Sequence, residues 1–219
     1  MNKELKKRII TSIVLIAILL NCLFISKESW LVLLGVVSII SFSEFFNLIK
    51  KIYKKIFSRL FLLTISIAVL LLFTYSAYKI KIEYGEIVMI FILLICIFSD
   101  IGGYIVGKSV GGKKLTKISP NKTISGSVGS FLFSLFPIGI YGVLSIITNK
   151  DYFKFALDDE MIVACLILSL TCQLGDLLIS FYKRKAKVKD TGNILPGHGG
   201  MLDRIDGIIF AVIVSLILN

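Results

Sequence analysis

Residues 173–206 read QLGDLLISFYKRKAKVKDTGNILPGHGGMLDRID, and both the fold and the site follow from this stretch. It begins in an apolar segment, becomes strongly basic and ends in a glycine-rich turn followed by D-R-x-D. At a helical spacing of three to four residues, Gln173, Asp176 and Ser180 share one face, and Asp203 and Asp206 share another. These three of the stretch's four aspartates, amid six cations and beside a glycine-rich turn, suit a divalent metal that holds a polyphosphate.

The alternative interpretation is a topology signal, because charge runs at membrane edges usually have that role. The glycines, the only histidine and the D-R-x-D sequence are not needed to anchor a helix. We therefore favour a functional site.

The composition is that of a membrane protein. Of the 219 residues, 56% are hydrophobic, and apolar runs of about 20 residues, long enough to span a bilayer, recur along the chain. We expect an all-α, polytopic integral membrane protein with about seven transmembrane helices in a single transmembrane domain, residues 1–219. Residues 1–99 hold the N-terminal helices and residues 100–219 the catalytic half. The expected spans are residues 9–25, 30–49, 57–78, 86–107, 127–147, 161–182 and 207–218.

The last span is short for a bilayer. Residues 207–218 rise about 18 Å as a helix, against an apolar core of about 30 Å, whereas a helix that begins at Met201 rises about 27 Å. The acids expected near the same depth as the start of this helix are Glu44, Asp100, Asp176, Asp203 and Asp206. An ionised carboxylate in hydrocarbon costs about 2.5–3.5 kcal/mol, so their gathering predicts a wet, metal-occupied cavity. The alternative, that the acid caps or pairs locally, stays open for Glu44.

Lysine and arginine predict the orientation. Twenty of the 25 lie in the N-terminus and in the segments 50–59, 108–126 and 183–206, and five lie in the alternate loops. By the positive-inside rule, the N-terminus and the stretch 173–206 face the cytosol and the C-terminus lies outside. The expected location is the bacterial inner (plasma) membrane.

Other classes fit less well. The net charge of +11 sits in short loops, so no nucleic-acid partner is expected. Cys22, Cys96, Cys165 and Cys172 lie in apolar segments without a C-x-x-C pair, which argues against zinc and against a disulfide framework. The first apolar run is long and lacks an A-x-A-like site, which favours an uncleaved span over a signal peptide.

Two further segments carry candidate phosphate ligands. Residues 102–109 match G-x-x-x-x-G-K-S, but a phosphate loop needs a preceding strand, so we interpret these glycines as sites of close helix packing. The loop of residues 113–126 offers hydroxyl, amide and ammonium donors to a phosphate or base, and the alternative of an ordinary basic loop that ends in a helix cap stays open. His198 is expected at the surface as a donor to phosphate.

Residues 180–206 have the pattern S-x-x-K-R-x-x-x-x-K-D-x-G-x-x-L-P-x-H-G-G-x-x-D-R-x-D and thereby resemble the CDP-diacylglycerol synthase (phosphatidate cytidylyltransferase) family. D-x-G-x-Y-x-x-G-K from Asp100, S-P-N-K-T from Ser119 and Q-x-G-D from Gln173 are also similar to the family. The resemblance covers about the C-terminal half of the chain. Ser125 stands where Glu is common, and the N-terminal half is shorter than in most members. Tyr182 replaces the usual aliphatic residue or Phe.

The resemblance implies a dimeric enzyme that converts CTP and phosphatidic acid into CDP-diacylglycerol and pyrophosphate with Mg²⁺, with room for a monovalent cation. The expected metal ligands are Asp176, Asp203 and Asp206. The expected catalytic residues are these three aspartates, Lys183, Arg184, His198 and Arg204. The expected substrate-binding residues are Asp100, Ser119, Asn121, Lys122, Thr123, Gln173, Ser180, Lys189, Asp190, Gly199 and Gly200.

Three rival functions remain for comparison. A CTP-dependent cytidylyl- or phosphotransferase acting on an ether lipid or a polyprenol would use the same headgroup chemistry. A transporter predicts acids spread through the membrane depth and internal repeats, which this sequence lacks. A CDP-alcohol phosphotransferase predicts a D-G-x-x-A-R core, which is also missing.

Overall fold

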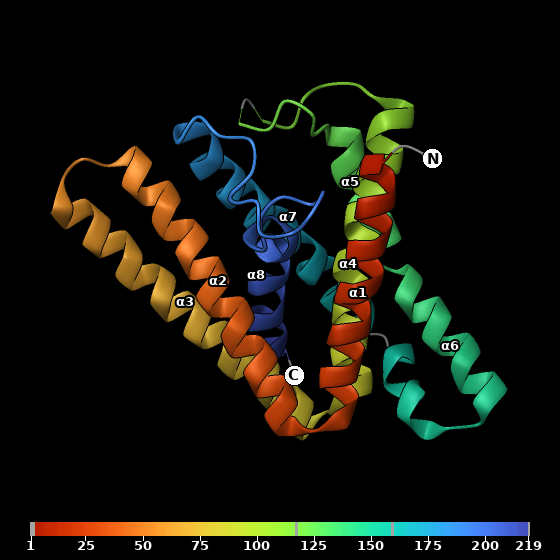
Figure 1. Ribbon diagram of the computed structural model, residues 1–219. Coiled ribbons are helices and arrows are strands. Elements are labelled where there is room, and N and C mark those ends of the chain that lie inside the picture. Colours follow the sequence, from red (N-terminus) through yellow and green to blue (C-terminus); the bar gives the residue numbers. More distant parts are fainter. Residues whose placement is uncertain (1–2, 117, 159, 219) are drawn as a thin grey trace. The chain divides into compact units, whose positions relative to one another are not determined.

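The computed structural model describes residues 3–116, 118–158 and 160–218, and among these residues there are helices and no β-strand (Figure 1). The helices are α1 (Lys3–Ile25), α2 (Lys27–Ile52), α3 (Ile56–Glu83), α4 (Gly85–Val110), α5 (Ile124–Phe133), α6 (Phe136–Thr148), the short 3₁₀ helix η1 (Asp151–Leu157), α7 (Glu160–Lys185) and α8 (Leu202–Leu218). The predicted all-α class is confirmed. Lys117, which the charge count used, lies outside the described residues.

Six helical segments in the described part of the chain are long and apolar enough to cross a membrane. Five are α1, α2, α3, α4 and α7, and the sixth combines α5 and α6 over residues 124–148. The polytopic membrane fold is therefore confirmed. The predicted seventh span corresponds to α8, which begins at Leu202, has 17 residues and is not among the six.

The predicted span 127–147 is not one continuous helix. It is divided between α5 and α6 at Ser134 and Leu135, with Pro137 in the first turn of α6. Proline has no N–H to donate and fits the first turn of a helix, which explains a new helix beginning at this point.

The chain forms two compact units. The first contains residues 1–86, with α1, α2 and α3, together with residues 179–206. The second contains residues 87–178 and 207–219. The basic, glycine-rich stretch after α7 thus belongs to the same unit as the N-terminal helices.

Contacts within the first unit bring predicted cytosolic segments to the same end of its helices. Thr11 near the start of α1 donates a hydrogen bond of 3.0 Å to the Pro196 carbonyl. Lys185 at the end of α7 donates one of 2.9 Å to the hydroxyl of Tyr53, which follows α2. Lys81 near the end of α3 bonds the Ser26 carbonyl between α1 and α2, where segments predicted to lie outside meet. The side of the membrane that each of these segments faces stays a prediction.

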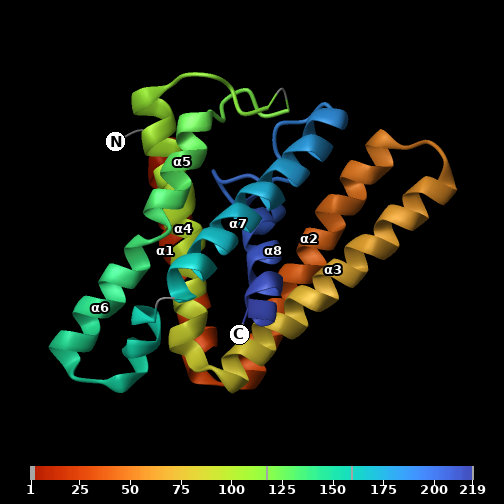
Figure 2. The same cartoon turned by 180° about the vertical axis from the view of Figure 1, so that it is seen from behind.

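In the second unit, α5 packs closely along α4 through small residues (Figure 2). A Cβ atom built on Gly102 would lie 2.5 Å from the Gly129 carbonyl oxygen, and one on Gly103 would lie 2.6 Å from Ser130 Oγ. These glycines lie inside α4 with no strand before them, so the G-x-x-x-x-G-K-S match does not form a phosphate loop. Their predicted role in close helix packing is confirmed.

Candidate active site

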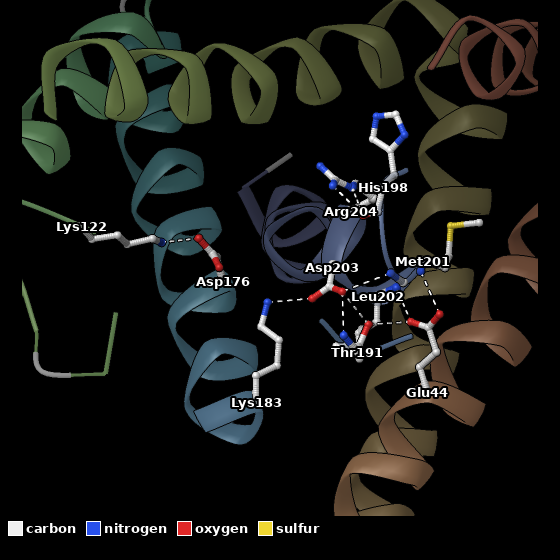
Figure 3. A network of polar contacts seen from close by, with 11 residues as sticks. Glu44, Lys122, Asp176, Lys183, Thr191, His198, Met201, Leu202, Asp203 and Arg204 are labelled. Carbon is white, nitrogen blue, oxygen red and sulfur yellow. Dashed lines mark hydrogen bonds and ion pairs between the residues drawn. The ribbon is translucent and has the colours of Figure 1, made fainter. Parts of the chain in front are cut away.

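Asp203 lies in the first turn of α8 and is surrounded by donors of the first unit (Figure 3). Its Oδ1 accepts a hydrogen bond of 2.7 Å from Lys183 Nζ at the end of α7. Its Oδ2 accepts from the backbone N–H of Thr191 at 2.7 Å and that of Gly200 at 3.2 Å. The side chains of Lys183 and Asp203 are 13% and 7% exposed, so this ion pair is shielded from water. The sequence placed Lys183 on phosphate and Asp203 on a metal ion; here the two side chains pair with each other, and those two roles stay predictions.

Burial by itself raises the pKa of the Asp203 carboxyl, but hydrogen bonds from Lys183 and Thr191 and the positive charge of Lys183 outweigh it. The net pKa is lower than the ordinary value for Asp, and the carboxyl is ionised at neutral pH. A carboxylate held by fixed backbone donors is a suitable oxygen ligand for a divalent cation.

Glu44 on α2 is the second acid of this cluster and is only 3% exposed. It accepts hydrogen bonds from the Met201 N–H at 3.0 Å, the Leu202 N–H at 2.9 Å and the Thr191 hydroxyl at 2.8 Å. Free backbone N–H groups at the start of a helix favour an anion. Glu44 therefore caps α8 from a different helix. It has a capping role, as one alternative held, but across the sequence rather than locally.

The glycine-rich turn is shaped by backbone and packing requirements. Gly197 and Gly199 have φ values of 75° and 85°, which disfavour other residues. A Cβ atom on Gly200 would overlap the Thr191 hydroxyl and lie 2.5 Å from Glu44 Oε2. The turn thereby places the Gly200 N–H against Asp203, and Asp190 lies next to Gly199.

His198 is half-buried in this turn rather than at the surface as predicted. Its Nε2 lies 3.1 Å from the Ser12 hydroxyl of α1, and its carbonyl accepts two hydrogen bonds from the Arg204 guanidinium. Its Nδ1 is buried without a hydrogen-bond partner among the described residues. The turn is therefore attached to α1 on one side and to α8 on the other, and the phosphate-donor role of His198 stays a prediction.

The other predicted residues of the first unit differ in exposure. Asp206 and Ser180 are buried, at 9% and 8% exposed. Arg184, Lys189 and Arg204 are exposed, as phosphate-binding cations at a membrane surface need to be.

The second unit contains its own carboxylate–lysine pair. Lys122 Nζ forms an ion pair with Asp176 of α7, and both side chains are 29% exposed (Figure 3). Thr123 accepts a hydrogen bond of 3.0 Å from the Gly126 N–H and is the N-cap of α5. The loop thus ends in a helix cap, as one alternative predicted. Its lysine pairs with Asp176, and the binding of phosphate or base by the loop stays a prediction.

Gln173, one turn before Asp176, joins a buried chain of polar side chains. Its Oε1 accepts from Ser127 at 2.6 Å and its Nε2 donates to Ser169 at 3.3 Å. Ser169 in turn lies 2.8 Å from Ser99. This chain gives Gln173 a structural role, and its substrate-binding role stays a prediction. The remaining predicted residues here are Asp100, in α4, Ser119, half-buried in the loop, and Asn121, exposed beside Lys122.

Within the described ranges, no group of three or more His, Cys, Asp or Glu side chains is arranged to hold a metal ion. Each unit instead places a lysine ammonium on a predicted ligand, Lys183 on Asp203 and Lys122 on Asp176. Each of these carboxylates thus accepts a cationic partner, and oxygen donors are the ligands that Mg²⁺ prefers. The residues therefore fit the predicted ion in chemical type.

Three contributors to this arrangement were not singled out in the sequence. Thr191 connects Glu44 with Asp203, Ser12 contacts His198, and Tyr53 binds Lys185. A lone hydroxyl in an apolar helix or after a basic run has no spacing that distinguishes it. Glu44, the partner of Thr191, differs from these three, because an acid within an apolar span stands out in the sequence.

Comparison with known proteins completes the description. A model of the cytidylyltransferase family matches residues 54–219. The phosphatidate cytidylyltransferase of Rickettsia bellii (strain RML369-C) is 32% identical over 219 residues, which are 100% of this chain and 92% of that protein. The protein of the same name from Rickettsia prowazekii (strain Madrid E) is 31% identical, with 97% and 90% covered. That from Bacillus subtilis (strain 168) is 38% identical over 131 residues, so the match spans 59% of this chain and about half, 46%, of that protein.

Proposed function

Because this chain belongs to the cytidylyltransferase family and is thus a CTP-using nucleotidyltransferase, we propose that it transfers CMP from CTP to phosphatidic acid. The products are CDP-diacylglycerol and pyrophosphate. The observation that carries the choice of lipid is the match, over the whole chain, to a Rickettsia bellii protein named phosphatidate cytidylyltransferase.

The reaction needs no general base. The second pKa of a phosphomonoester is near 6, so the phosphate oxygen of phosphatidic acid is already anionic at neutral pH. That oxygen forms a bond to the α-phosphorus of CTP while the bond from this phosphorus to the bridging oxygen breaks and pyrophosphate leaves. Two negatively charged substrates must be aligned and their charge neutralised, which suits a cluster dominated by lysine, arginine and backbone N–H groups.

The chain's own residues divide this work. Exposed Arg184, Lys189 and Arg204, together with Lys183, would hold the lipid phosphate and the triphosphate. His198 and the glycine backbone would bind the departing pyrophosphate. Lys122 with its neighbours in the loop is a second triphosphate site.

We propose Asp176, Asp203 and Asp206 as ligands of Mg²⁺, which would supply charge stabilisation on the phosphates. Asp203 and Asp176 each accept a cationic partner, which is compatible with this choice. A monovalent cation is a further expectation from the resemblance.

The reaction is proposed at the cytosolic face of the bacterial inner membrane. The excess of Lys and Arg in alternate loops supports that orientation. A homodimer is expected from the resemblance and is testable by light scattering of the purified protein.

One assay tests the proposal. Purified protein is incubated with labelled CTP and phosphatidic acid in detergent or nanodiscs, and pyrophosphate is measured with and without Mg²⁺. Mg²⁺-dependent release of one pyrophosphate per CDP-diacylglycerol is the expected result. Parallel reactions with an ether-lipid phosphate and a polyprenyl phosphate identify the lipid, and turnover with one of these instead of phosphatidic acid would reject the proposed substrate.

A further inference from the structure

Glu44 is a buried acid of the first unit, and both of its carboxylate oxygens accept hydrogen bonds. It belongs to α2, inside a segment apolar enough to span a membrane, and it is 3% exposed. Its Oε1 accepts from the Met201 N–H at 3.0 Å, and its Oε2 accepts from the Leu202 N–H at 2.9 Å and from Thr191 Oγ1 at 2.8 Å. Both oxygens are thus used by groups of the stretch that carries Asp203.

The donors that contact Glu44 and those that contact Asp203 come from the same few residues. Thr191 Oγ1, which lies on Glu44, is also 3.0 Å from Asp203 Oδ2, and the Thr191 N–H donates to that same oxygen at 2.7 Å. Gly200, whose N–H is 3.2 Å from Asp203 Oδ2, packs so closely on Glu44 that a Cβ atom would lie 2.5 Å from Oε2. Moving the Glu44 carboxylate therefore moves both backbone donors of Asp203.

We propose that Glu44 is a positioning residue for the nucleotidyl transfer. Its carboxylate fixes Thr191 and the first turn of α8, and these in turn hold Asp203 in one orientation. The effect of Glu44 on catalysis rests on the proposed function, whereas its effect on the loop between α7 and α8 does not. In Glu44→Gln, an amide NH₂ replaces one carboxylate oxygen and then faces the N–H of Met201 or Leu202, which is also a donor. Even this isosteric change therefore disturbs the arrangement.

The variant is Glu44→Gln and the matched control is Glu28→Gln. Glu28 lies in the first turn of the same helix with its side chain 69% exposed, so the control removes the same charge without touching the loop. The first readout is limited trypsin digestion in nanodiscs, because Lys187 and Lys189 are exposed cleavage sites in the loop that Glu44 holds. Lys113, an exposed site in the second unit, reports global unfolding.

We expect Glu44→Gln to speed cleavage at Lys187 and Lys189 about tenfold or more, with cleavage at Lys113 unchanged. Loss of a group that orients a metal ligand typically costs about 10–100-fold in metal affinity or activity. The Mg²⁺ concentration for half-maximal pyrophosphate release should therefore rise by about that factor. Glu28→Gln should match the wild type in both measurements.

Each alternative outcome is decisive. Unchanged loop cleavage in Glu44→Gln overturns the proposal, and so does a lower kcat at an unchanged Mg²⁺ midpoint, which indicates a structural role alone. If Glu44→Gln does not fold, Glu44→Asp, which keeps the charge on a side chain shorter by one methylene, is judged by the same two readouts. If wild-type protein releases no pyrophosphate from CTP and phosphatidic acid, the proposed function fails, while the digestion still tests whether Glu44 holds the loop.

Discussion

Replacing Asp203 by asparagine separates a structural role of this carboxylate from a catalytic one. Asparagine keeps the size of the side chain and one oxygen. That oxygen can still accept from the N–H groups of Thr191 and Gly200, which now lie 2.7 and 3.2 Å from Oδ2. The new NH₂ group then faces the Lys183 ammonium, and the 2.7 Å charged hydrogen bond is lost.

The cost in stability follows from that one lost contact. Hydrogen bonds to charged groups contribute about 1.5–3 kcal/mol, and the flexible Lys183 side chain can turn toward water. We expect the free energy of unfolding to fall by about 2 kcal/mol, against a typical total of about 5–15 kcal/mol. For a chain of this size the midpoint of thermal unfolding should fall by about 4–8 °C, so the variant stays folded.

The effect on activity should be much larger. A direct ligand matters more than an outer-shell partner, so Mg²⁺-dependent pyrophosphate release should fall by more than about 100-fold. Asp158→Asn, at an exposed position after η1, is the control for the same chemical change. Thermal unfolding and pyrophosphate release are measured on the same preparations. Wild-type turnover in folded Asp203→Asn protein would falsify the assignment of Asp203 as a metal ligand.

Three further changes test other parts of the structure. Gly129→Ala puts a Cβ atom 2.7 Å from a backbone oxygen of α4 and should lower the free energy of unfolding by about 1–3 kcal/mol. The control Gly139→Ala has open space around the new Cβ atom and should leave the free energy of unfolding unchanged. Equal melting points for the two variants would contradict the packing described for α4 and α5. Lys122→Met removes the ammonium that pairs with a carboxylate of α7. If this lysine also binds the triphosphate, one charge-assisted contact worth about 1.5–3 kcal/mol is lost and the KM for CTP should rise about tenfold or more. An unchanged KM rejects the second triphosphate site. In intact cells, a membrane-impermeant thiol reagent should label Lys150→Cys and should not label Lys187→Cys. Wild-type protein is the background control. Labelling of Lys187→Cys alone would show that the orientation is the opposite of the one proposed.

The membrane helices were largely predictable because each corresponds to a continuous run of apolar residues. The predicted spans fall inside the observed helices except near Ser134 and Leu135, where one predicted span is two helices. Pro137 was the available signal for that break, but hydropathy averages over a window and does not register a single missing N–H group. The close packing of Gly102 against α5 was predictable in kind, since small residues let helices approach.

The sequence singled out Asp203 and Lys183 but not the contacts that support them, and their roles in catalysis stay predictions. Spacing within the stretch of residues 173–206 pointed to Asp203 and its basic neighbours because those residues are close in sequence. Glu44 and Ser12 reach the same stretch across 147 and 186 positions, for their partners Thr191 and His198. Periodicity within one helix contains no information on which distant loop that helix will meet. His198 shows the same limit, since its glycine-rich flanks gave no sign of its contact with Ser12 of α1.

The long sequence separation between Glu44 and its donors has a consequence for how the protein is made. The Thr191 hydroxyl is synthesised 147 residues after Glu44, which at about 5–20 residues per second is a wait of about 7–30 s. During that interval α2 enters the membrane with an acidic side chain whose final partners do not yet exist. We expect the loop to take its mature form only after Leu202 has been synthesised, so translation that stops before α8 emerges would leave an inserted α2 whose Glu44 lacks these partners.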